Sequence, residues 1–180
     1  VGGLGDESSF PYLFAAYNAG AGRTISDRAA AAMASLEGDY ASFLAGILRR
    51  GTLAEKLAAL QAALRDGALQ AENRAELSES ALSAGLETQG SNAVDQKMLV
   101  DLRSQAAREL AAQKWQRASP LAVKHFYDYQ VMYNRGQLAK SDFLESIALL
   151  GAMGTQEAAQ ALSLYLQLIN TETEQGKSYD

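Results

Sequence analysis

Residues 141–170 constrain the fold more than any other stretch, because they predict two helices joined by a very short turn. Apolar residues recur every three or four positions on both sides of a break at Gly151 and Gly154. Thr155, directly after the second glycine, is suited to cap a new helix. The expected buried positions of this pair are Phe143, Ile147, Leu150, Ala158, Ala161, Leu162, Tyr165 and Ile169.

The rest of the chain also favours helix. Only two of the 180 residues are prolines, and alanine and leucine dominate over β-branched residues. With 48% apolar residues the chain can form a packed core. We therefore predict an all-α fold of about nine short helices. Expected boundaries include a cap at Ser8 or Ser9, a start at Ser26, a capping box at Thr52–Glu55, an interruption at Gly85 and a long helix, with Val94 on its apolar face, running to about Arg117.

Short helices with short links suggest antiparallel pairs that stack on one another. We expect an irregular α-solenoid that occupies residues 1–180 as a single domain, with residues 1–6 and 171–180 flexible. The chain begins without methionine and ends in a short polar tail. We therefore expect it to be part of a longer protein.

The turn of the predicted pair resembles a known repeat. The segment A-L-L-G-A-M-G-T-Q-E-A, residues 148–158, followed by Ala161, Leu162 and Leu166, is similar to the HEAT-type repeat. The sequence departs from that pattern where Leu149-Leu150-Gly151 replaces the family's Ala-Leu-Gly. The resemblance implies an α-solenoid that binds other proteins and carries no catalytic residues.

A second resemblance lies near the N-terminus. Glu7-Ser8, followed by A-Y-N-A-G at residues 16–20, is similar to two motifs of lytic transglycosylases, which cleave peptidoglycan. The resemblance implies that Glu7 is a general acid and that Tyr17 and Asn18 border the substrate. In that family, however, several tens of residues and a G-L-M-Q segment separate the motifs, whereas here they lie about ten residues apart.

A cluster of aromatic residues gives the candidate binding site. Tyr127, Tyr129 and Tyr133 occupy one predicted helix, and Arg135 follows it. Tyrosine and arginine are favoured at protein-binding hot spots. Tyrosines of a small helical domain also commonly pack with only the hydroxyl at the surface. We keep both interpretations.

The sequence predicts no metal, cofactor or catalytic site. His125 is the only histidine and cysteine is absent, so His125 with Asp128 makes a poor metal site. Glu72, Glu76 and Glu79 form an acidic stripe that is typical of a solvated helix face. The net charge of −5 argues against a nucleic-acid partner. No apolar run is long enough for membrane insertion.

We therefore predict a non-enzymatic scaffold that binds another protein. The alternatives are a peptidoglycan-lytic or peptidoglycan-binding module and a purely structural spacer. The sequence leaves the compartment open between the cytoplasm and a bacterial cell envelope, because cysteine-free proteins occur in both.

Overall fold

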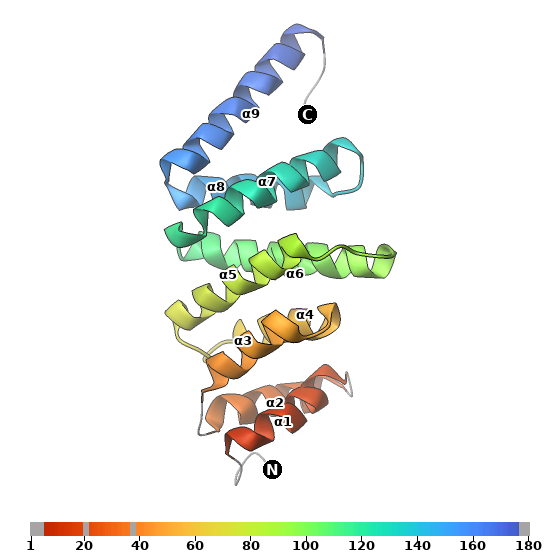
Figure 1. Ribbon diagram of the computed structural model, residues 1–180, viewed down its shortest axis with the longest axis vertical. Coiled ribbons are helices and arrows are strands. Elements are labelled where there is room, and N and C mark those ends of the chain that lie inside the picture. Colours follow the sequence, from red (N-terminus) through yellow and green to blue (C-terminus); the bar gives the residue numbers. More distant parts are fainter. Residues whose placement is uncertain (1–5, 20–21, 37–38, 177–180) are drawn as a thin grey trace. The chain divides into compact units, whose positions relative to one another are not determined.

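The computed structural model describes residues 6–19, 22–36 and 39–176, which form helices and turns without a strand (Figure 1). Within them the all-α fold and the nine predicted α-helices are confirmed. In order, the elements are η1 (Glu7–Ser9), α1 (Phe10–Asn18), α2 (Arg23–Ser35), α3 (Tyr40–Arg50), α4 (Leu53–Ala63), α5 (Ala71–Glu87), α6 (Ala93–Ala112), η2 (Gln116–Ala118), α7 (Ser119–Asn134), α8 (Lys140–Met153) and α9 (Gln156–Glu174).

The chain divides into two compact units, residues 1–106 and residues 107–180. In the first unit α1 packs on α2, and α3 packs on α4 and α5. The amphipathic pattern of α3 explains its packing, because Tyr40, Leu44 and Leu48 lie one turn apart and are all buried. Each buried leucine side chain stabilises the unit by about 1.5–3 kcal/mol. That the chain is a single domain stays a prediction.

In the second unit α7 packs on both α8 and α9, and α8 packs on α9. The turn between α8 and α9 forms as its sequence predicts. Gly154 ends α8 in the left-handed conformation, with φ of 61°. The Ala158 N–H donates to Thr155 Oγ1 at 3.3 Å and so caps α9. The capping box of α4 is also confirmed: the Thr52 N–H donates to Glu55 Oε2 at 2.7 Å, and the Glu55 N–H donates to Thr52 Oγ1 at 3.3 Å.

One expected boundary is right in position, and two others are wrong. Ser9 occupies the N-cap position of α1, but its side chain makes no capping hydrogen bond. The Asp6 carboxylate instead caps the preceding turn η1 by accepting from the Ser8 N–H at 3.0 Å. The second helix begins at Arg23, before Ser26. The long helix ends at Ala112, well before Arg117, because the chain takes a left-handed turn at Lys114, with φ of 50°.

Two glycines expected to break helices lie inside them. A Cβ at Gly85 would lie 2.7 Å from Arg103 Cγ, so in α5 the missing side chain makes room for an arginine stem. Gly151 lies within α8, where a Cβ would meet nothing within 4 Å. The expected apolar face of α6 is partly wrong, since Val94 is exposed whereas Leu102 is buried.

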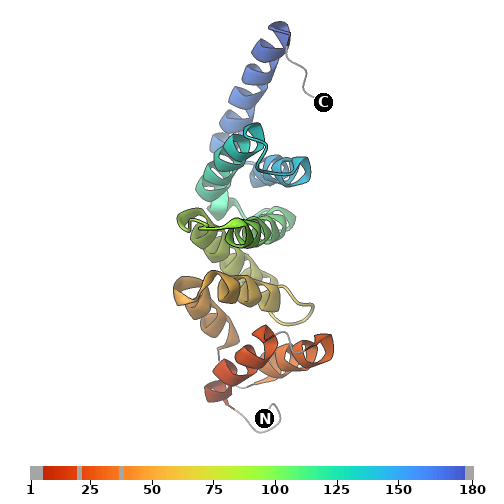
Figure 2. The same ribbon diagram turned by 90° about the vertical axis from the view of Figure 1, so that its right-hand side faces the viewer.

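The last helix is only partly packed. Its buried residues are Ala158 and Ala161, both in its first two turns. Beyond them α9 extends past α7 and α8 in both views of the second unit (Figures 1 and 2). It continues to Glu174, so residues 171–174 of the segment expected to be flexible are helical. Residues 1–5 and 177–180 lie outside the described residues.

Candidate functional site

Helix α7 carries most of the aromatic cluster predicted from the sequence, and it divides those residues between two faces. Tyr129 is completely buried and packs against His125, with ring centroids 4.0 Å apart. His125 is buried to the same extent. Tyr129 therefore belongs to the core and is inaccessible to a partner in this structure.

Tyr133 is partly buried and partly exposed. Its ring stacks on Phe143 of α8, with centroids 4.9 Å apart and planes 10° from parallel. Phe143 also contacts Phe126 and Tyr165, which makes an aromatic cluster shared by α7, α8 and α9. Partial burial raises the pKa of Tyr165, and a negative charge on Tyr133 would raise it further. The half-buried Tyr133 thus links the helices rather than standing free.

The outer face of α7 is different. Tyr127 and Val131 lie one helical turn apart and are 41% and 47% exposed. Lys124 and Arg135, at either end of this pair, are also exposed. We call these four residues the α7 surface. An aromatic and an aliphatic side chain between two cations can bury apolar area against a protein and pair with its carboxylates.

The residues of the transglycosylase-like resemblance are spread over η1 and α1. Glu7 is exposed in η1, before the helix, and Asn18 is exposed at its last position. Tyr17 is half-buried one residue earlier. Tyr17 follows Glu7 by ten residues. At a helical rise of about 1.5 Å per residue, they lie about 15 Å apart along the helix axis. The structure does not bring them together around one reacting atom.

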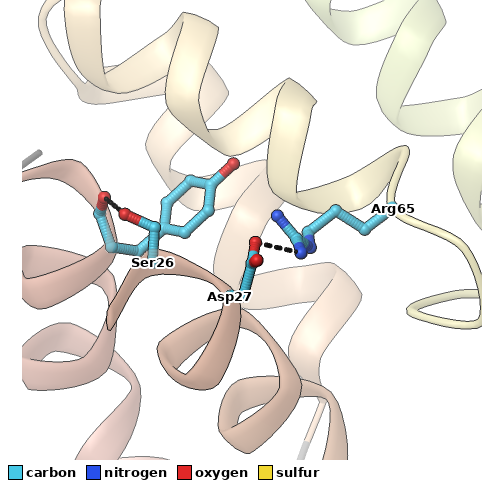
Figure 3. A network of polar contacts seen from close by, with 4 residues as sticks. Ser26, Asp27 and Arg65 are labelled. Atoms are coloured by element: carbon cyan, nitrogen blue, oxygen red, sulfur yellow. Dashed lines mark hydrogen bonds and ion pairs between the residues drawn. The ribbon is translucent and has the colours of Figure 1, made fainter. Parts of the chain in front are cut away.

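Tyr17 instead belongs to a polar network within the first unit. Figure 3 shows Arg65 reaching Asp27, with Arg65 Nη2 2.6 Å from Asp27 Oδ1. Ser26 donates to the Tyr17 carbonyl oxygen at 3.2 Å in the same region (Figure 3). Burial raises the pKa of Tyr17, and the Arg65 guanidinium lowers it. Because Arg65 and Asp27 are partly exposed, this ion pair contributes at most about 1 kcal/mol.

The first unit also contains an open groove of about 650 Å³ between α1 and α3. Phe14, Phe43 and Ile47 supply its apolar lining, and Arg49 and Arg50 lie at one end. The sequence does not predict this groove. The consecutive arginines are the one signal for it in the sequence, but cations are also favoured in the last turn of a helix that has no binding role.

The remaining candidates give no chemical site. Among residues 6–19, 22–36 and 39–176, no group of three His, Cys, Asp or Glu side chains is placed to hold a metal ion. Asp128 is half-buried beside the buried His125, and both make interactions within the chain. Glu72 and Glu76 of the acidic stripe are exposed. None of the described helices has both the length and the apolar character that a membrane span requires.

No protein-family model, curated protein or solved structure matches the chain. The function is therefore inferred from the chain's own residues.

Proposed function

We propose that the chain is a non-catalytic, HEAT-like helical-repeat scaffold that binds another protein through the α7 surface. The observation that carries the proposal is the exposure of Tyr127 and Val131 on the outer face of a helix whose opposite face is buried. In this proposal Lys124 and Arg135 select a partner whose apolar patch is bordered by carboxylates.

The helix pairing supports the scaffold part of the proposal. Consecutive helices pack together in α1 with α2, α3 with α4 and α7 with α8. Such pairs are the building units of α-solenoids, which bury one face of each pair against the next. The tight turn at Gly154 and Thr155 gives the last pair the small-residue connection typical of HEAT-type repeats.

The composition of the α7 surface supports the binding part. Tyrosine is enriched among interface hot spots, whose truncation costs about 2 kcal/mol or more of binding free energy. A tyrosine that is already ordered by its neighbours loses little entropy on binding. Tyr127 meets this condition, because its ring contacts Phe126 with centroids 5.3 Å apart.

The two alternatives receive less support from the geometry. A peptidoglycan-cleaving site would need Glu7 and Tyr17 around one cleft, but Glu7 lies in η1, before α1, and Tyr17 lies near the end of α1. A purely structural spacer gives no reason for the exposed apolar pair Tyr127 and Val131 on α7. Muralytic assays of the wild type and of Glu7→Gln test the first alternative, and the binding experiment below tests the second.

The proposal is tested by affinity capture from extracts of the organism that encodes the chain. The variant Y127S/V131S should lose the captured partner, because both apolar anchors are removed. The variant Y12S is the matched control, since Tyr12 is 75% exposed and lies in the first unit. Circular dichroism and thermal unfolding of each variant verify the fold. Equal capture by wild type and Y127S/V131S, or no partner with either, contradicts the proposal.

A further inference from the structure

The second half of α9 carries apolar side chains that the described residues of the second unit leave largely exposed. Leu164 and Leu168 lie one turn apart and are 51% and 42% exposed. Leu166, which is 59% exposed, points about 200° away from Leu164 around the helix. Three exposed leucines within five residues are unusual in a helix whose first turns pack normally, and they indicate a docking surface.

The charge of α9 restricts what can cover these leucines. The helix contains no lysine or arginine, and it ends with Glu172 and Glu174. An amphipathic helix that binds membrane surfaces typically uses basic residues to attract anionic lipids, so this composition disfavours a lipid surface. It favours an apolar groove bordered by cations.

The groove of the first unit has that combination. Phe43 and Ile47 are half-buried in its lining, and Phe14 lies deeper, against Phe43, with ring centroids 6.0 Å apart. Arg49 and Arg50 are exposed and make no ion pair with any residue that the structure describes.

Arg50 is also positioned at the groove so that it can pair with a carboxylate of a bound partner. The Arg50 guanidinium lies over Gly46, where a Cβ would stand 3.3 Å from Arg50 Nη2. Glu55 is the groove's one acidic lining residue, and its carboxylate accepts from the Thr52 N–H at 2.7 Å. The capping hydrogen bond holds that carboxylate at the start of α4, and two cations remain to face a partner.

We propose that α9 of one copy of this chain docks into the α1–α3 groove of a second copy. Leu164 and Leu168 enter the apolar lining, and the glutamates at the end of α9 approach Arg49 and Arg50. A volume of about 650 Å³ accommodates two leucine side chains with room for the adjoining helix turn. Charge complementarity determines the direction, because the acidic helix end meets the cationic end of the groove.

This contact joins two different surfaces, so it is heterologous and forms head-to-tail chains or rings of copies. It uses neither Tyr127 nor Val131. Self-association and binding through the α7 surface are therefore separate properties, and Y127S/V131S should self-associate like the wild type.

Sedimentation velocity over a concentration series tests the proposal. The wild type should show a weight-average mass that rises with concentration, and raised salt should weaken this rise. L164E/L168E and R49E/R50E should each weaken association at least tenfold. The matched controls are L166E on the other side of α9 and R23E/R28E, two exposed arginines of α2; both should associate like the wild type.

Mixing the two defective variants gives the sharpest readout. R49E/R50E keeps its α9 and L164E/L168E keeps its groove, so an equimolar mixture should form a 1:1 complex that grows no further. If reversing the arginines at the end of α3 unfolds the chain, R49Q/R50Q replaces that variant. The proposal is overturned if the wild type remains a monomer up to about 1 mM, if L166E is as defective as L164E/L168E, or if the mixture does not form the complex.

Discussion

Replacing Tyr40 by phenylalanine should stabilise the chain. Tyr40 begins α3 and is buried, and its ring stacks on Phe10 with centroids 5.6 Å apart. Its hydroxyl is buried without a hydrogen bond to any residue that the structure describes. A buried hydroxyl without a partner costs about 1–3 kcal/mol. Phenylalanine keeps the ring contacts, so Y40F should raise the free energy of unfolding by about 1 kcal/mol or more.

The same substitution should change the stability at alkaline pH. The pKa of Tyr40 is raised to about 12, mainly by burial and to a smaller extent by the negative charge of Tyr17, while Arg65 opposes the shift. Below the unfolded-state pKa of about 10 the tyrosine is neutral in both states and has no pH effect. Between pH 10 and 12 only the unfolded state loses the proton, so the wild type loses up to about 2.7 kcal/mol of stability. At pH 11 the loss is about 1.4 kcal/mol.

Urea unfolding of wild type and Y40F at pH 8 and pH 11 measures both effects. The difference between the two proteins isolates Tyr40 together with its interaction with Tyr17, because the remaining tyrosines contribute equally to each. Y12F is the matched control, and its exposed hydroxyl should change the stability by less than about 0.5 kcal/mol. The reasoning is refuted if Y40F is less stable than the wild type at pH 8, because the hydroxyl would then have a favourable partner. It is also refuted if the two proteins lose the same stability at pH 11.

Two further predictions concern the helices. Gly85→Ala should destabilise the first unit by about 1–3 kcal/mol, because the added Cβ would overlap Arg103. Gly151→Ala lies in open space and should instead stabilise the chain by about 0.5–1 kcal/mol. Thermal unfolding in which both variants shift the melting temperature in the same direction would contradict these predictions. Thr52→Ala should cost about 1 kcal/mol through loss of the α4 capping box, and an unchanged urea midpoint would show that the box contributes nothing.

The sequence predicted the fold class because helix formation is largely local. Nine α-helices follow from spacing, scarce prolines and caps such as that of Thr52. The predicted helix boundaries are wrong where the observed boundary depends on contacts with other parts of the chain. Gly85 remains in α5 because an arginine from another helix covers it, and no local pattern contains that information. The end of α6 at Ala112 depends on the left-handed turn at Lys114, which lysine rarely adopts.

The candidate site was predictable only in part. Alternation of buried and exposed residues along α7 separates Tyr127 from Tyr129, but spacing alone did not show which of them faces the core. The groove combines residues from α1 and α3 and needs their packing to exist. The exposed leucines of α9 lie outside the buried positions that the sequence predicts for this helix. Helical spacing alone does not show whether a partner covers them.

The most direct test of the scaffold proposal is site-specific photo-crosslinking in cells that produce the full-length protein. A photoreactive amino acid at position 127 lies in the proposed interface, and the same amino acid at the exposed position 12 lies in the other unit. The proposal predicts a protein adduct from position 127 that is absent from position 12 and is lost when V131E is added. Adducts of equal yield from both positions, or none from position 127, would contradict it.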